Sequence, residues 1–187
     1  MRVSVLRGAG RVEVEERPIP QPGAGEVLIA IGSVGVCGSD VHYYEHGRIG
    51  PYVVESPLVL GHEAGGTVTQ LGPDVTSLSV GQRVSIEPGV PCRNCRQCLA
   101  GRYNLCPRVR FFATPPYDGA FAEYVVMPES FVFAIPDSLS DDAAGLLEPL
   151  SVGVWACRRA SIGPGSRVMV TGAGPIGLIS AQTARAF

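Results

Sequence analysis

Lysine is absent from this sequence of 187 residues, and all fifteen of its basic residues are arginine. A chain without lysine can supply neither a Schiff-base lysine for a carbonyl substrate nor the lysine of a Walker-type phosphate loop. A strong excess of either charge is also absent, because the formal net charge is -2 and arginines and acids are interspersed. Without a basic stripe or a polybasic anchor, neither nucleic acid nor a membrane is expected as a partner.

Long apolar runs are missing as well. No stretch reaches the roughly 18 apolar residues of a membrane-spanning helix, and the N-terminal residues lack the apolar core of ~7 to 15 residues that a secretory signal needs. We therefore expect a cytoplasmic protein. In a reducing compartment, six cysteines favour metal ligands over disulfides, above all because four of them lie within fifteen positions.

Glycine and proline, in contrast, are abundant, with 24 and 16 residues, and the hydrophobic content is 45%. This composition is typical of a globular protein with many turns and short strands. Alternating apolar residues recur up to about Asp137 and predict a small, partly closed β-barrel. The expected strands include two joined by a glycine turn over residues 3–14, a long run over 26–36, one over 57–63 that ends in His62 and Glu63, and others over 67–71, 82–86 and 121–127.

Beyond the barrel the pattern changes. Ser140 and the two acids after it are typical of a helix start, and Pro149 opens a second helix to about residue 160. Residues 167–172 then predict a strand and residues 174–186 a helix. We expect a mainly β domain over residues 1–148, with a cysteine lobe at 91–107, followed by a linking helix and the first β-α unit of an α/β domain over residues 149–187.

The cysteine lobe contains Cys92, Cys95, Cys98 and Cys106. Two-residue gaps fold tightly enough for successive thiolates to bind one ion, so this spacing predicts a structural zinc site closed by four protein ligands. Two disulfides or reduced loop thiols are the alternatives.

A second set of metal ligands is spread along the chain. Cys37, His62, Glu63 and Glu148 are each weak signals alone, because a single cysteine is often an inert core residue, a single histidine a satisfied polar group and an acid before proline a helix-start charge. Only their sequence context makes them candidates for a catalytic zinc site, which keeps a position open for substrate.

A glycine-rich motif follows the predicted strand at residues 167–172. Gly172, Gly174 and Gly177 form a G-x-G-x-x-G that opens a helix, and such a motif lets a dinucleotide pyrophosphate approach the backbone at the helix N-terminus. A mononucleotide-binding half needs roughly three parallel strands. We therefore expect the chain to be the N-terminal half of a longer protein, to expose apolar surface over residues 166–187 and to be inactive alone.

Several segments resemble known signatures. VCGSDVH at residues 36–42 and GHEAGGTVTQLG at 61–72 resemble zinc-dependent medium-chain alcohol dehydrogenases, whose GroES-like catalytic barrel is joined to a Rossmann domain. Residues 36–44, 101–106, 111–116 and 147–153 resemble the sorbitol and xylitol dehydrogenase branch. The likeness covers essentially the whole chain.

The resemblance implies roles for individual residues. Cys37, His62 and Glu63 would hold the catalytic zinc, and Glu148 would take the place of a cysteine ligand of alcohol dehydrogenases. Ser39 and His42 match the proton-relay positions, although they can equally cap and decorate a short helix over residues 37–45. Tyr43 and Phe111 match substrate-pocket positions. With the cysteine lobe, two zinc ions per chain are expected.

The function that these features predict is the NAD-linked oxidation of a polyol, such as sorbitol or xylitol, to a ketose by a homo-oligomeric parent, expected to be a tetramer. Another secondary-alcohol or threonine-type dehydrogenase of the same family is one alternative. A catalytically inactive, zinc-bound structural or interaction module is the other. The acid that distinguishes NAD from NADP would come about 20 residues after the glycines, so NAD rests on the resemblance.

Overall fold

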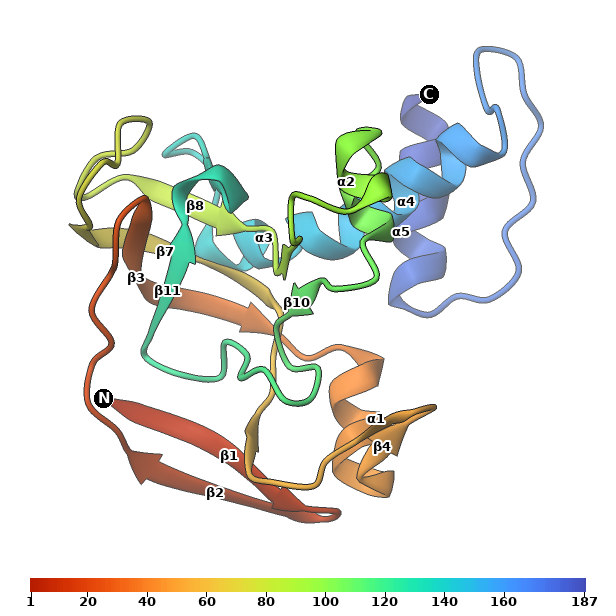
Figure 1. The fold of residues 1–187 in the computed structure, drawn as a ribbon. Coiled ribbons are helices and arrows are strands. Elements are labelled where there is room, and N and C mark those ends of the chain that lie inside the picture. The colour runs from red at the N-terminus through yellow and green to blue at the C-terminus, as the bar shows by residue number, and fades with distance from the viewer. The chain divides into compact units, whose positions relative to one another are not determined.

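The computed structural model describes residues 1–187, which form two compact units, Met1–Gly145 and Leu146–Phe187 (Figure 1). The first unit contains all the strands. None of the helices combines the length and the apolar character needed to cross a membrane.

The first unit opens with a hairpin. Strands β1 (Arg2–Gly8) and β2 (Arg11–Glu16) pair antiparallel around the expected glycine turn, and β6 (Leu58–Val59) pairs with the other edge of β1. The side chains of Val3 and Val5 are buried against Val59 in a small apolar cluster.

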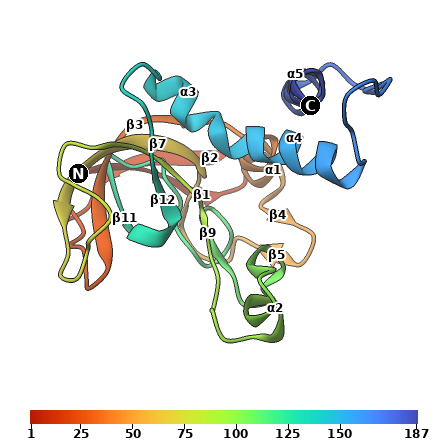
Figure 2. The same cartoon turned by 90° about the horizontal axis from the view of Figure 1, so that it is seen from above.

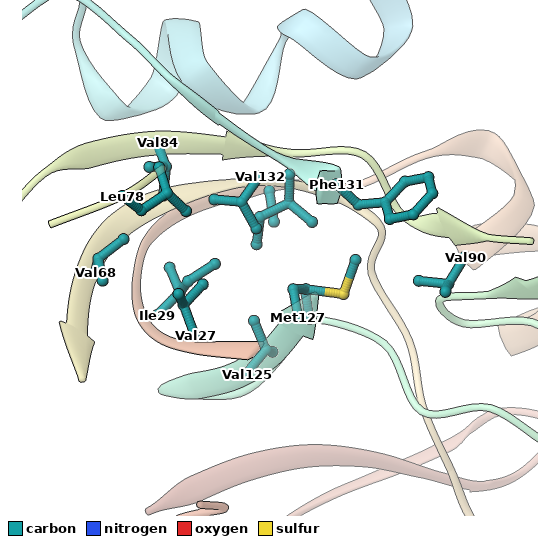
Figure 3. Close-up of a cluster of buried hydrophobic side chains, with 13 residues drawn as sticks. Val27, Ile29, Val68, Leu78, Val84, Val90, Val125, Met127, Phe131 and Val132 are labelled. Atoms are coloured by element: carbon teal, nitrogen blue, oxygen red, sulfur yellow. The ribbon is translucent and has the colours of Figure 1, made fainter. Parts of the chain in front are cut away.

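A five-stranded antiparallel sheet forms the centre of the first unit, in the order β11-β3-β7-β8-β12. Its strands are β3 (Glu26–Gly35), β7 (Glu63–Leu71), β8 (Arg83–Ile86), β11 (Tyr124–Pro128) and β12 (Val132–Ala134). The sheet curves around its apolar side chains, and Figure 3 shows Ile29, Met127 and Val132 pointing into the same interior. The expected mainly β, partly closed barrel is confirmed.

The pairing of β3 with β7 contains two irregularities. Thr69 is an extra residue between the partners of Leu28 and Ile29, and Gly32 is an extra residue between the partners of Gly65 and Gly66. Such bulges bend a strand and redirect the side chains beyond them.

Other elements of the first unit extend from the strands. Helix α1 (Gly38–His46) follows β3, as expected, and leads into the small hairpin β4 (Arg48–Ile49) and β5 (Tyr52–Val53). The cysteine lobe lies away from the five-stranded sheet (Figure 2) and contains α2 (Arg96–Leu99) and η1 (Tyr103–Leu105). It is flanked by the paired strands β9 (Gly89–Val90) and β10 (Arg110–Phe111). Between β11 and β12 lies η2 (Glu129–Phe131).

The first unit ends with α3 (Asp141–Gly145), which contacts β3, β7 and β8. Ser140 Oγ accepts a hydrogen bond from the Ala143 N–H at 3.2 Å, as the position of Ser140 at the helix start predicts.

One predicted strand was drawn too long. The segment before Glu63 forms only the two residues of β6, and Glu63 begins β7 instead of ending the preceding strand. Gly61, with φ of 86°, turns the chain between the two strands. A left-handed backbone of this kind interrupts a strand, so the run of apolar residues misplaced the boundary.

The second unit consists of two packed helices, α4 (Leu147–Arg159) and α5 (Pro175–Ala186). The strand expected over residues 167–172 is not formed, because a strand needs a hydrogen-bonded neighbour and the chain offers no second parallel strand. The apolar surface expected over residues 166–187 is confirmed: Val168, Met169 and Leu178 are 44%, 87% and 54% exposed.

Candidate metal centres

Three of the predicted catalytic zinc ligands come together in the first unit. One ligand atom each from Cys37, His62 and Glu63 lies within 4.8 Å of the others. The pairing of β3 with β7 explains this, because Gly35 at the end of β3 is opposite Glu63 at the start of β7. Cys37 follows β3 by two residues, and His62 immediately precedes β7, so one ladder positions residues that are 25 positions apart in sequence.

Gly35 makes room for this centre. A Cβ atom at residue 35 would overlap the Glu63 carboxylate, so only glycine allows this carboxylate to lie against β3. The Glu63 and His62 residues are 8% and 7% exposed. A buried carboxylate and a buried imidazole require partners, and a metal ion is one that would satisfy both.

Asp40 is a functional residue that the sequence analysis missed. Its side chain is 2% exposed, and its carboxylate accepts hydrogen bonds from the Cys37 and Gly61 backbone N–H groups, each at 2.9 Å. Asp40 Oδ1 also lies 3.8 Å from His62 Nδ1. The sequence pattern Cys-x-x-Asp at the start of a helix could have predicted part of this arrangement, because an acid at the third helical position accepts a hydrogen bond from the N–H of the N-cap residue.

A zinc ion fits the donor set. His62 Nδ1 is buried without a hydrogen-bond partner, and it faces the Asp40 carboxylate. A metal-binding histidine ordinarily directs its second ring nitrogen at a carboxylate or carbonyl group, which fixes its tautomer. A thiolate, an imidazole and a carboxylate are also the three ligand types that zinc prefers.

The other predicted residues of this region differ in their surroundings. The Phe111 ring lies 5.6 Å from the His62 ring, so Phe111 flanks the metal centre. Tyr43 is 4% exposed in an apolar cluster, and burial, followed by the charge of Tyr52, raises the pKa of its hydroxyl. Ser39 lies half-buried in the first turn of α1, and His42 is exposed one turn later.

The four lobe cysteines form the second centre. The Sγ atoms of Cys92, Cys95, Cys98 and Cys106 all lie within 4.8 Å of one another, and all four cysteines are free thiols. Cys106 Sγ accepts hydrogen bonds from the Cys92 and Arg108 backbone N–H groups, both at 3.4 Å. The Arg108 guanidinium donates to Cys92 Sγ at 3.3 Å.

The sulfur atoms of this second centre are not equivalent. The backbone N–H of Asn94 is the main cause that lowers the pKa of Cys92, to about 6, whereas desolvation raises the pKa of Cys98 to about 12. Neighbouring thiols that interact this closely titrate as a set, and a bound cation would favour the thiolate form of all four sulfurs. Four convergent sulfurs with backbone N–H donors fit a structural zinc ion.

Glu148 and the glycine motif belong to the second unit. Glu148 lies in the first turn of α4 and is partly buried, and its place in the catalytic zinc site stays a prediction. Gly174 is the N-cap of α5, and a Cβ at Gly177 would overlap the Gly172 carbonyl oxygen. Gly172 has φ of 98°, and open space surrounds Gly174, so the motif has the backbone that a close-lying pyrophosphate requires.

Comparisons with known proteins identify the family of the chain. Residues 23–137 match the family model of the alcohol dehydrogenase GroES-like domain. Sorbitol dehydrogenase of Bacillus subtilis (strain 168) is 50% identical over 187 residues, which are 100% of this chain and 53% of that protein. The probable D-xylulose reductase A of Aspergillus clavatus is 52% identical over 98% of this chain and 51% of its own length.

Structural comparison gives the same result. A crystal structure of an alcohol dehydrogenase from Escherichia coli CFT073, complexed with NADH, has a TM-score of 0.90 and 33% identity and covers 99% of this chain and 53% of that chain. The chain spans about half the length of the curated relatives it matches. Because the family model matches residues 23–137, which form the barrel and contain both cysteine-containing centres, the chain belongs to the family with the alcohol dehydrogenase GroES-like domain.

Proposed function

We propose that this chain supplies the zinc-binding half of a dehydrogenase that oxidises a secondary hydroxyl of a polyol to a ketone with NAD. The observation that carries the proposal is the convergence of Cys37, His62 and Glu63 beside the Phe111 ring. The similarity to a sorbitol dehydrogenase and a D-xylulose reductase over nearly the whole chain supports a polyol as the substrate class.

In this proposal Cys37, His62 and Glu63 hold the catalytic zinc, together with Glu148 as the fourth residue of the set. When bound, zinc acts as a Lewis acid that lowers the pKa of a substrate hydroxyl. Asp40 holds the His62 ring in one orientation, because its carboxylate is itself fixed by two backbone N–H groups. Phe111 covers one side of the His62 ring and excludes water there.

The proton of the substrate hydroxyl must leave the site. Ser39 is proposed to accept it and His42 to pass it to solvent, since Ser39 is half-buried and His42 is exposed on the same helix. A hydroxyl group and an imidazole can each both accept and donate a proton, so they are suited to this task. Tyr43 is proposed to border the substrate.

The hydride acceptor is proposed to bind through the second unit. Gly172, Gly174 and Gly177 bring bare backbone to the N-terminus of α5, where N–H groups attract a pyrophosphate. The cofactor NAD accepts the hydride when bound. The cysteine lobe is proposed to hold a second, structural zinc, and the full-length protein is proposed to be a cytoplasmic homo-oligomer, a tetramer.

Turnover by the full-length, zinc-loaded protein tests the function. Sorbitol, xylitol, threonine and a simple secondary alcohol should each be assayed with NAD and with NADP. We expect the highest kcat/KM for a polyol with NAD, and its loss in His62→Ala. A preference for threonine or the simple alcohol would assign a different dehydrogenase of the family, and absence of turnover with all four would leave a zinc-binding module without this activity.

A further inference from the structure

Helix α1 carries two exposed histidines one turn apart, His42 and His46. Their rings stack with centroids 4.3 Å apart and an interplanar angle of 24°. Residues four apart in a helix lie on the same face, so both imidazoles reach the same part of the helix surface. The chain has three histidines, and these two lie outside both cysteine-containing centres.

The spacing is suited to chelation. Helical zinc motifs hold their metal with two histidines at positions i and i+4. Residues 42–46 have this spacing, in the order H-x-x-E-H. Imidazole binds borderline cations such as Zn²⁺ and Ni²⁺. The helix is exposed here, so water molecules would complete the coordination.

His46 already has the surroundings of a metal ligand. Its Nδ1 lies 3.3 Å from the His42 backbone carbonyl oxygen and 3.9 Å from Glu45 Oε2. When Nδ1 carries the ring proton and donates it to the carbonyl, Nε2 presents its lone pair to a cation. Position favours a cation too, because His46 lies in the last turn of α1, at the negative end of the helix dipole.

We propose that His42 and His46 form a surface chelate for a borderline divalent cation, with Glu45 as a nearby counter-charge. The site is separate from both zinc centres and fills only after them, since it offers two protein ligands. One consequence rests on the proposed function: an ion bound here immobilises the His42 imidazole, so excess zinc slows the turnover of the dehydrogenase.

Nickel binding by the full-length, zinc-loaded protein tests the proposal. Isothermal titration with Ni²⁺ should detect one ion more per chain in the wild type than in His46→Gln, His42→Gln or the double variant. Val41→Gln is the matched control, because Val41 is an exposed residue of the same helix with no metal-binding atom; it should bind nickel as the wild type does. Equal nickel binding by wild type and His46→Gln would overturn the proposal, as would a thiolate-to-nickel absorption band that accounts for all the bound nickel.

Turnover separates this inference from the proposed function. Excess Zn²⁺ should inhibit the wild type but not His46→Gln, which retains His42 and should have wild-type activity at low zinc. Equal inhibition of the two proteins would refute the link to turnover. If the protein binds nickel through the histidine pair but oxidises no alcohol, the proposed function fails and the metal site stands.

Discussion

Replacing Asp40 by asparagine should weaken both the fold and metal binding at the proposed centre of Cys37, His62 and Glu63. The carboxylate is 2% exposed and accepts two backbone N–H groups, each at 2.9 Å. An asparagine amide retains one oxygen for one of these donors but turns its NH₂ group toward the other. The N–H that loses its acceptor is left unsatisfied, which costs about 1–3 kcal/mol of unfolding free energy.

The effect on metal binding is separate from the effect on stability. Without the carboxylate next to His62 Nδ1, the imidazole is less firmly oriented, and removal of such a partner typically lowers metal affinity roughly 10–100-fold. Chelator competition on zinc-loaded protein measures this affinity, and urea unfolding measures the stability. The zinc of the cysteine lobe should be released as in the wild type.

Asp118→Asn is the matched control. Asp118 also accepts a backbone N–H, from Val59 at 2.8 Å, and its other carboxylate oxygen accepts from Arg17, but it is not among the residues of either metal centre. This variant should lose stability without losing zinc affinity. Wild-type zinc affinity in Asp40→Asn, or an equal loss in Asp118→Asn, would refute the reasoning.

Three further predictions concern single residues. Arg108→Met should accelerate chelator-induced zinc release from the cysteine lobe, because Arg108 donates a hydrogen bond to Cys92 Sγ at 3.3 Å. Arg96→Met removes the same charge from the same lobe and should release zinc at the wild-type rate. Equal rates in all three proteins would show that the contact is without effect. Gly35→Ala should lower the unfolding free energy by about 1–3 kcal/mol in urea titrations, because the new Cβ would overlap the Glu63 carboxylate. In the control Gly38→Ala, the new Cβ meets open space in α1, so this variant should be as stable as the wild type or more stable. No loss of stability in Gly35→Ala would contradict the placement of Glu63. The pKa of Glu129 is lowered by hydrogen bonds from the hydroxyl and N–H of Ser77 and the N–H of Thr76, so the ionised carboxylate stabilises the fold above its unfolded-state pKa, and this stabilisation is lost as the pH falls through the lower folded-state pKa. In urea titrations, Glu129→Gln should therefore be less stable than the wild type near neutral pH and equally stable in acid. A stability difference that persists in acid would disprove this origin.

The sequence was most informative where a short spacing determines the geometry. Four cysteines within fifteen positions can meet at one ion with little help from the rest of the chain, and their sulfurs do lie together. Cys37 and His62 were harder, because their proximity depends on the pairing of β3 with β7. That pairing is a property of the whole sheet, so for these residues the family resemblance carried the prediction.

Other features depend on contacts that local patterns do not contain. Asp40 reads as an ordinary acid in the first turn of a helix, and only the approach of Gly61 and His62 makes it a buried acceptor. The run of apolar residues at 167–172 has the composition of a strand but no neighbouring strand with which to pair, and composition alone cannot supply the ladder. The boundary at Glu63 was lost for a related reason, since a glycine with positive φ is not distinguishable in sequence from one in an extended strand.

The two bulges between β3 and β7 also determine which insertions and deletions in these strands the protein can tolerate. The extra Thr69 shifts the pairing by one residue, and the extra Gly32 on the opposite strand shifts it back, so Gly35 meets Glu63 in the same offset as Val27 meets Leu71. The two irregularities therefore cancel, and the barrel end and the metal end of the ladder stay in phase. Deletion of either residue alone would move Glu63 out of register with Gly35, whereas deletion of both would restore it. Length changes in these strands should thus be accepted only as compensating pairs, and metal binding reports directly whether the two strands are in phase.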